Sequence, residues 1–520
     1  MVTSNLTELL KEAVKRKPYK RAVVCPVSRD FKGRVTYSHL TFQQLEEESD
    51  RYAWGLEKAG IKKGTKTILM IRPSLEFFNL TFALIKIGAV PVMIDPGMGY
   101  LKMVKSLETV GAEAFIGIPA AHLLRVAFPD SFKSVKIAVT VGRRLFWGGL
   151  TLKDIYSDVR DPYPYAKMKP DEMAAIFFTT GSTGPPKGTV YEHGMLDAQV
   201  EFLRGHFGYG EDDIDLATFP LFSLFDTALG MTSVIPDMDP TRPGFADPKK
   251  LVEAIHNQGC TNMFGSPALL ANLARYGEET GVKLPSLKRV ITAGAPVRPE
   301  MLMSFKKMLP EGAVIHTPYG ATEVLPVSDI SSETILTETW EKTMQGGGTC
   351  VGLPLPGITV EIIEITDEPI PEWKDVKILP PYEIGEITVK GPNVTKEYYN
   401  LPEHTRKAKI YDGNTVWHRM GDVGYKDEKG RLWFCGRKSH RVVAKDRTYF
   451  AIPTEAIFNR HPRVLRTAIV GVGNKGEQIP VLCVELKPSE RIRDEEDRKK
   501  LIEELKQLGS TDERTKNISH

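Results

Sequence analysis

Up to about residue 345, short apolar runs alternate with amphipathic stretches. Four β-branched runs predict buried strands, at 66–72, 136–142, 288–294 and 313–320. Two stretches, 40–60 and 74–88, have the apolar spacing of helices. This alternation is typical of parallel sheets covered by helices. We therefore predict an α/β fold with layered sheets and helices for this part of the chain.

The pattern changes between residues 346 and 436. Shorter strands separated by Pro- and Gly-rich turns replace the helical spacing there, which predicts an antiparallel barrel or sheet. A new compact segment follows Arg437 and contains a charged helix predicted within 489–509. We predict a large N-terminal domain at 1–436, with a barrel-like subdomain at 346–436, and a small α+β C-terminal domain at 437–520.

Composition places the chain among globular proteins. Its 520 residues are 41% hydrophobic and 26% charged. A chain of this length can form more than one hydrophobic core. The net charge of +3 gives no support for a nucleic-acid or membrane-surface partner. Five widely spaced cysteines argue against a disulfide framework and a zinc site. We see neither a signal peptide nor a run of about 18 apolar residues, and expect a cytoplasmic protein without a transmembrane segment.

The stretch FFTTGSTGPPKG, at 177–188, carries the strongest chemical signal. Its glycines let backbone N–H groups approach an anion, which the hydroxyls and the lysine can also bind. The nucleotide loop G-x-x-x-x-G-K-[ST] does not fit. Aligned on Gly181, it would require Gly at Pro186 and Ser or Thr at Gly188. The stretch is therefore a candidate for another phosphate chemistry, with a plain Gly/Pro turn as the alternative.

Three further stretches carry polar groups in a notable order: ITAGAPVRPE (291–300), HTPYGATEVLP (316–326) and HRMGDVGYKDEKGRLWFCGRKSHRVV (418–443). The first two follow apolar strands, where open α/β sheets bind ligands. Together with the loop, at these separations, they resemble the adenylate-forming superfamily of acyl-CoA synthetases, peptide-synthetase adenylation domains and firefly-type luciferases. The resemblance covers nearly the whole chain. It implies that ATP is a substrate, that AMP is a product and that Mg²⁺ is required.

The resemblance also implies a role for each matching residue. The leaving pyrophosphate would be bound by Thr179, Thr180, Gly181, Ser182, Thr183, Gly184 and Lys187. Glu323 would hold Mg²⁺ as a hard oxygen ligand, unless it is only a carboxylate at a helix start. Adenine and ribose would be bound by Gly294, Ala295, Pro296, Tyr319, Gly320, Thr322, Asp422 and Arg437. We expect Thr180, Lys187 and Glu323 to be the catalytic residues.

Two apolar, aromatic stretches, 219–230 and 262–267, are candidates for an acyl pocket. The residues expected to line it are Phe219, Phe222, Phe225, Phe264 and Gly265. Such a pocket would hold a long alkyl chain at about 25 cal/mol per Å² buried. An equal alternative is that these two stretches are part of the buried core and line no pocket. Many relatives carry His where Ser223 stands, which leaves open how this point of the pocket is gated.

The segment after Arg437 bears on the second half-reaction. Acyl-CoA synthetases carry acidic residues here and then a Gly-Gly-Glu-type loop that helps form the CoA channel. This chain has Ser439 and His440 at the acidic positions and no glycine in AKDRTYF. The stretches around the motifs, together with GRKSHRVV and IPTEAIFNRHP, resemble most the OleC-type β-lactone synthetases of long-chain olefin biosynthesis. In that group the hydroxyl of the adenylated acid expels AMP, so CoA is not needed.

The resemblance thus implies adenylation of a long-chain 2-alkyl-3-hydroxy acid, closure to a β-lactone, and other enzymes of an olefin pathway as partners. One alternative is a fatty acyl-CoA or acyl-carrier-protein ligase that uses CoA. Another is a non-catalytic nucleotide- and acyl-binding regulator, since the family's C-terminal adenylating lysine is not found. We expect that lysine beyond His520 and the C-terminal domain to be incomplete, with Lys438 and Lys445 as the nearest alternatives.

Overall fold

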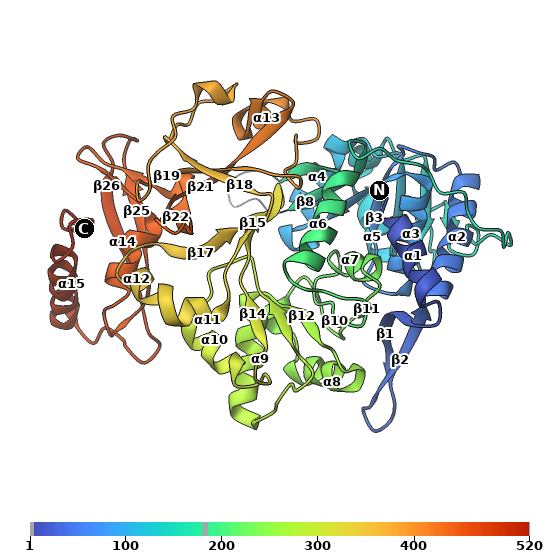
Figure 1. The fold of residues 1–520 in the computed structure, drawn as a ribbon, viewed down its shortest axis with the longest axis horizontal. Coiled ribbons are helices and arrows are strands. Elements are labelled where there is room, and N and C mark those ends of the chain that lie inside the picture. Colours follow the sequence, from blue (N-terminus) through green and yellow to red (C-terminus); the bar gives the residue numbers. More distant parts are fainter. Residues whose placement is uncertain (1–4, 180–185, 519–520) are drawn as a thin grey trace. The chain divides into compact units, whose positions relative to one another are not determined.

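The computed structural model describes residues 5–179 and 186–518, which divide into two compact units (Figure 1). The first unit comprises Met1–His316, Gly320–Pro326 and Pro392–Thr405. The second comprises Thr317–Tyr319, Val327–Gly391 and Arg406–His520. The predicted domain from 437 stays a prediction, because the second unit contains both that segment and the barrel-like one. Mixed sheets and helices confirm the predicted α/β class.

The first sheet of the first unit is parallel except at one end. Its strands lie in the order β7 (Leu150–Thr151), β6 (Ile137–Thr140), β5 (Ala114–Gly117), β3 (Lys66–Met70), β4 (Val90–Ile94), β8 (Met173–Thr179) and β9 (Lys187–Glu192). Only β9 runs antiparallel to its neighbour, β8. The segments after β4, β5, β6 and β8 therefore leave the sheet at one shared edge.

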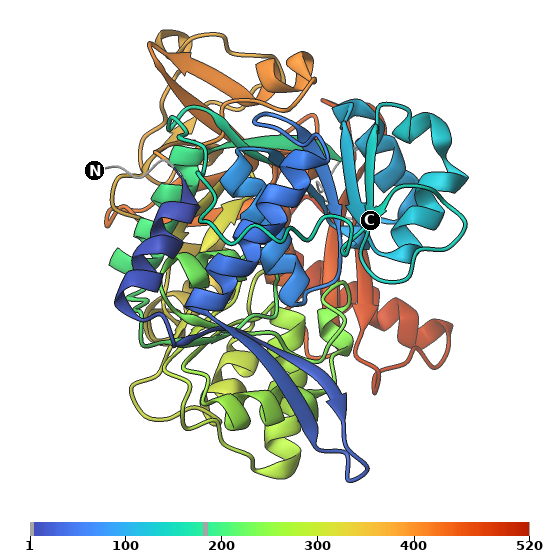
Figure 2. The same ribbon diagram turned by 90° about the vertical axis from the view of Figure 1, so that its right-hand side faces the viewer.

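The second sheet of this unit is also mainly parallel. Its order is β14 (Val314–His316), β13 (Arg289–Ile291), β12 (Asn262–Phe264), β10 (Ile214–Leu216), β11 (Thr232–Val234), β1 (Arg21–Arg29) and β2 (Val35–Thr41). The strands β1 and β2 form an antiparallel hairpin that extends away from the helices in both views (Figures 1 and 2). The predicted strands at 66–72, 136–142, 288–294 and 313–320 correspond to β3, β6, β13 and β14.

The helices α2 (Phe42–Lys58) and α3 (Leu75–Ile87) contribute to a core shared with strands of both sheets. A helix that is apolar on all sides belongs inside a protein, and nearly every residue of α3 is buried. Ser74 caps its start by accepting from the backbone N–H of Phe77, and Gly88 ends it at φ +75°. The buried ammonium of Lys86 pairs with Asp50 of α2 at 2.6 Å, which satisfies a charge that burial alone would destabilise.

The other face of the first sheet is covered by α4 (Tyr100–Val110) and α5 (Pro119–Ala127), which share a second core cluster with its strands. Figure 2 shows these cyan helices on the side of the strands away from the blue helices α2 and α3. Further described helices of this unit are α1 (Leu6–Arg16), α6 (His193–Gly205), α7 (Ser223–Ala228), α8 (Pro248–Gln258), α9 (Pro267–Thr280) and α10 (Pro299–Lys306). Among residues 5–179 and 186–518, no helix has the length and hydropathy needed to cross a bilayer.

The second unit is built on antiparallel strands. They lie in the order β17 (Thr349–Pro354), β22 (Leu432–Arg437), β21 (Thr415–Lys426), β19 (Gly385–Lys390) and β18 (Thr359–Ile363), with β20 (Lys409–Asp412) paired to β21. This confirms the antiparallel pattern predicted for 346–436. The chain then forms α14 (Ala451–Phe458), the hairpin β25 (Val464–Val472) and β26 (Ile479–Leu486), and α15 (Glu495–Ser510). The predicted charged helix therefore starts at Glu495, where Asp494 caps it.

Two carboxyl groups are buried together in the first unit. Asp215 lies on β10 and Asp226 on α7, at 6% and 3% exposure. Burial, with a neighbouring carboxylate adding to it, raises the pKa of Asp215 to about 7 and raises the pKa of Asp226 well above its usual range. In the unfolded chain both would titrate near about 3.9. The stability that the protonated pair contributes is therefore fully present below about pH 4 and is lost as the pH rises through about 7.

We expect the free energy of unfolding to fall between about pH 5 and about pH 8, and to fall less in Asp226→Asn, whose amide stays neutral. Urea denaturation at the two pH values measures this difference. The control is Asp212→Asn, an exposed carboxylate paired with Lys17, which should keep the wild-type pH dependence. The same loss of stability in Asp226→Asn as in the wild type would contradict the burial argument.

Candidate active site

The predicted phosphate loop connects β8 to β9. In the register of this strand pair Thr179 lies opposite Lys187, so the two ends of the connection are adjacent. Residues 180–185 and the side chain of Thr179 lie outside the described residues. The roles of Thr179 and of Thr180, Gly181, Ser182, Thr183 and Gly184 therefore stay predictions. Lys187, at the end of the loop, lies within the described residues.

The Lys187 ammonium lies over the ring of Tyr398, 5.0 Å from its centroid. A cation in this position is attracted by the electrons of the ring face. Burial lowers the pKa of Lys187, and the charge of Glu323 opposes that shift. The Tyr398 ring thus orients the lysine, which also interacts electrostatically with Glu323, the predicted magnesium ligand.

Tyr398 also contacts Glu323 directly. Its hydroxyl donates to Oε1 of Glu323, and the Tyr398 side chain is only 5% exposed. Burial, reinforced by the negative charge of Glu323, raises the pKa of Tyr398 above its usual range, so the hydroxyl stays protonated and can donate. Tyr398 was not predicted from the sequence, because its contact with Glu323 spans 75 positions and the neighbouring Tyr399 has the same side chain.

An extended segment of the first unit, 395–399, holds these groups in place. Thr189 of β9 pairs with Tyr398, and the backbone N–H of Tyr399 donates to the carbonyl of Gly188 at 2.8 Å. The backbone N–H of Thr395 donates to the carbonyl of Glu323 at 2.9 Å. The segment therefore links β9, which carries Lys187, to the backbone of Glu323.

Glu323 fits the predicted role of a magnesium ligand. A carboxylate is the hard oxygen donor that Mg²⁺ prefers, and a hydrogen bond that orients such a ligand is a common feature of metal sites. Tyr398 supplies that bond, and Lys187 places a positive charge near the same group. The geometry is compatible with metal binding at Glu323, which stays a prediction.

Three residues predicted to bind adenosine meet in the second unit. The carboxylate of Asp422, 2% exposed, accepts from the Tyr319 hydroxyl at 2.6 Å and from Nη1 of Arg437 at 2.7 Å. Asp422 and Arg437 are paired in the register of β21 and β22. Burial, and then the charge of Asp422, raise the pKa of Tyr319 above its usual range. The hairpin thus places a carboxylate, a guanidinium and an aromatic ring together.

The other residues predicted for adenosine lie in the first unit. Gly294, Ala295 and Pro296 form an exposed turn after β13, and Gly294 has φ +97°, which favours glycine. A Cβ on Gly320 would lie 2.8 Å from the carbonyl of Val324, so only glycine fits there. The carbonyl of Thr322 accepts from the Tyr191 hydroxyl at 2.6 Å. Their contacts with adenosine stay predictions.

The aromatic residues of the candidate acyl pocket form a cluster. The ring centroid of Phe222 lies 4.8 Å from that of Phe219 and 5.1 Å from that of Phe264. These three rings and that of Phe225 are half-buried rather than buried. Gly265 is buried, and a Cβ there would lie 2.8 Å from Leu270. Half-buried rings are more compatible with a lining than with a closed core, and the acyl pocket stays a prediction.

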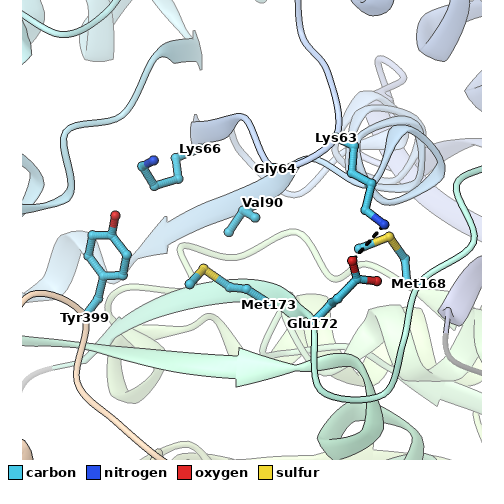
Figure 3. Close-up of a pocket in the computed structure, with 9 residues that line it drawn as sticks. Lys63, Gly64, Lys66, Val90, Met168, Glu172, Met173 and Tyr399 are labelled. Carbon is cyan, nitrogen blue, oxygen red and sulfur yellow. Dashed lines mark ion pairs between the residues drawn. The ribbon is translucent and has the colours of Figure 1, made fainter.

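A cavity of about 250 Å³ lies elsewhere in the first unit (Figure 3). Lys66, Val90 and Met173, which begin β3, β4 and β8, line it together with Tyr399 and the ion pair of Lys63 and Glu172. It therefore lies at the amino ends of parallel strands. The predicted phosphate loop follows the opposite end of β8, so this cavity is distinct from the predicted ATP site.

A comparison with known families identifies the class of protein. The profile of the family described as AMP-binding enzyme matches residues 10–399, and the chain belongs to this family. The Lys187 and Glu323 cluster lies in the first unit of the chain, and the Asp422 cluster lies in the second. The predicted adenylate-forming ligase class is therefore confirmed.

Two curated relatives differ in how similar they are to this chain. The chain is 47% identical to the olefin beta-lactone synthetase of Xanthomonas campestris pv. campestris over 93% of this chain and 87% of the relative. It is 26% identical to the long-chain-fatty-acid–CoA ligase of Thermus thermophilus over 88% of this chain and 82% of the relative. The predicted similarity to β-lactone synthetases is confirmed.

The fold is shared with a solved structure of O-succinylbenzoate coenzyme A synthetase from Bacillus subtilis in complex with ATP and magnesium ion. The TM-score is 0.74 at 21% identity, over 95% of this chain and 92% of the other. At this identity the likeness supports the fold alone.

Lys187→Ala should lower adenylation at least tenfold, because a charged contact to the departing pyrophosphate is worth on the order of 2.7–4 kcal/mol in the transition state. Pyrophosphate release with ATP and a long-chain acid measures this. The control is Lys396→Ala, which removes an exposed lysine paired with Glu192 on β9. Unchanged pyrophosphate release in Lys187→Ala would exclude the lysine from the site.

Tyr398→Phe should raise the Mg²⁺ concentration needed for half-maximal pyrophosphate release by about tenfold, since partners that orient a metal ligand typically contribute that much. The ring that contacts Lys187 is kept, so only the hydrogen bond to Glu323 is lost. Tyr399→Phe is the matched control, because that side chain lines the separate cavity. An equal Mg²⁺ requirement in the two variants would refute the positioning role of Tyr398.

Proposed function

We propose that this protein is an ATP- and Mg²⁺-dependent β-lactone synthetase whose substrate is a long-chain 2-alkyl-3-hydroxy acid. The observation that carries the proposal is the 47% identity to an olefin beta-lactone synthetase along 93% of the chain. Identity to the fatty-acid–CoA ligase falls to 26%. The CoA-using alternative is therefore less supported.

The first half-reaction activates the acid. A carboxylate is a poor acyl donor because its leaving group would be oxide, so its oxygen attacks the α-phosphate of ATP and pyrophosphate departs. In this proposal Lys187 binds the pyrophosphate, and Asp422 and Arg437 bind the nucleoside. The contact of Lys187 with Tyr398 and the ion pair of Arg437 with Asp422 support these roles. Mg²⁺ bound at Glu323 would neutralise phosphate charge. The acyl-adenylate that results has AMP as a good leaving group.

The second half-reaction closes the ring. The 3-hydroxyl oxygen attacks the acyl carbon, the bond to AMP breaks, and the hydroxyl proton is released. A hydroxyl held two carbons away has a high effective concentration, worth about 7–11 kcal/mol in favourable cases. The half-buried rings of Phe219, Phe222 and Phe264 would exclude water from the adenylate. Cleavage of the mixed anhydride, with loss of AMP, drives the closure of the strained four-membered ring.

Two further features of the proposal concern the setting of the enzyme. The substrate implies a preceding enzyme that makes a 2-alkyl-3-hydroxy acid and a following one that consumes the β-lactone, so we propose partners from an olefin pathway. We also propose a cytoplasmic location. Co-purification of the protein from cells of its own source would test the proposed partners.

The protein, given ATP, Mg²⁺ and a long 2-alkyl-3-hydroxy acid, should release AMP and form a β-lactone without CoA. Mass spectrometry of the lipid products measures this. Added CoA should leave the yield unchanged, because the hydroxyl already present is the acceptor.

The control is a plain fatty acid of equal length, which should be adenylated without forming a lactone. An acyl-CoA thioester that forms only when CoA is supplied, from either acid, would establish the ligase alternative instead. ATP binding without pyrophosphate release from any acid would establish the regulator.

A further inference from the structure

The helix α5 presents an apolar face to solvent. Its exposed residues are Ala120, Leu123, Val126 and Ala127, which recur at helical spacing. Leu123 is 46% exposed and Val126 is 43% exposed. The solvent side of a surface helix normally carries polar side chains, so burial within the first unit does not account for this face.

The loop after β6 extends the same surface. Trp147 is buried and stacks on His122 of α5, with ring centroids 5.3 Å apart and planes at 4°. The ring of Phe146 contacts that of Trp147 at 5.2 Å, yet Phe146 is 74% exposed and Leu145 is 48% exposed. The stack joins the loop to the helix. We call Ala120, Leu123, Val126, Ala127, Leu145 and Phe146 together the α5 surface.

Positive charge borders the α5 surface. Arg143 and Arg144 are exposed and directly precede Leu145, and Arg125 lies on α5. Asp154 is an acidic neighbour of Arg144, so it offsets part of this charge. Exposed apolar and aromatic side chains beside arginines are typical of surfaces that lie in the boundary between lipid headgroups and acyl chains.

We propose that the α5 surface binds the boundary region of an anionic lipid bilayer. Leu123, Leu145 and Phe146 enter the apolar layer, while Arg143 and Arg144 contact lipid phosphates. Charge complementarity favours this partner over a second copy of the chain. A two-fold contact would place the surface against itself and bring like charges together.

The role of bilayer binding by the α5 surface rests on the proposed function. A 2-alkyl-3-hydroxy acid with two long chains partitions into bilayers. The segments that form the α5 surface follow β5 and β6, whose carboxyl ends share an edge with that of β8. At about 4.8 Å per strand, the four steps from β6 to β8 span about 20 Å. A substrate leaving the bilayer would reach the first unit at the edge where β8 ends.

Flotation of the whole protein with vesicles tests the proposal without substrate. The protein should bind vesicles of phosphatidylcholine with phosphatidylglycerol, and bind pure phosphatidylcholine at least about tenfold less. Leu123→Glu/Phe146→Glu and Arg143→Gln/Arg144→Gln should each lower binding about tenfold. Phe245→Glu is the control, since Phe245 is 90% exposed and lies outside the α5 surface.

Three results would overturn the proposal: no binding to anionic vesicles, equal binding to both kinds of vesicle, or wild-type binding by both double variants. Self-association in ultracentrifugation that Leu123→Glu/Phe146→Glu abolishes would show a contact between copies instead. Pyrophosphate release from a soluble short-chain acid should be unchanged in every variant. A failed lactone assay would leave the vesicle result intact, so the two hypotheses are tested separately.

Discussion

Glu323 and Lys187, of opposite charge, are held by one tyrosine in the first unit. The hydroxyl of Tyr398 donates to the carboxylate, and its ring lies under the ammonium. Charged groups are costly to bury unless other groups stabilise them, and Tyr398 stabilises both with different parts of one side chain. The predicted ATP site requires a metal ligand and a cation that lie close together and are oriented separately. The segment 395–399, laid along β9, provides this arrangement.

In the second unit, a buried carboxylate is stabilised by two neighbouring side chains. Asp422 is almost fully buried, and a buried carboxylate requires donors. Strand register brings Arg437 opposite it, and Tyr319 donates from outside the hairpin. The two clusters therefore form independently, each by contacts within its own unit. That residues of both clusters bind one nucleotide is part of the proposed function.

The α5 surface shows how composition can conceal local chemistry. The net charge of +3 over 520 residues gives no sign that Arg125, Arg143 and Arg144 lie beside a strip of exposed apolar side chains. Periodicity alone would assign Leu123 and Val126 to the core side of a helix. The stack of Trp147 on His122 uses the other face of α5 for packing, so these residues remain in solvent.

The sequence by itself determined the alternation of strands and helices, the change to antiparallel strands after about residue 345, and the residue types of the predicted ATP site. These depend on local spacing and on motifs of adjacent residues, which the linear order preserves. The resemblance of those motifs to the adenylate-forming superfamily implied the roles of Lys187, Glu323, Asp422 and Arg437. Tyr398 and the α5 surface were decided only by the tertiary structure. Each depends on side chains that are distant in the chain, or on which face of a helix is covered, and local pattern carries no information on either.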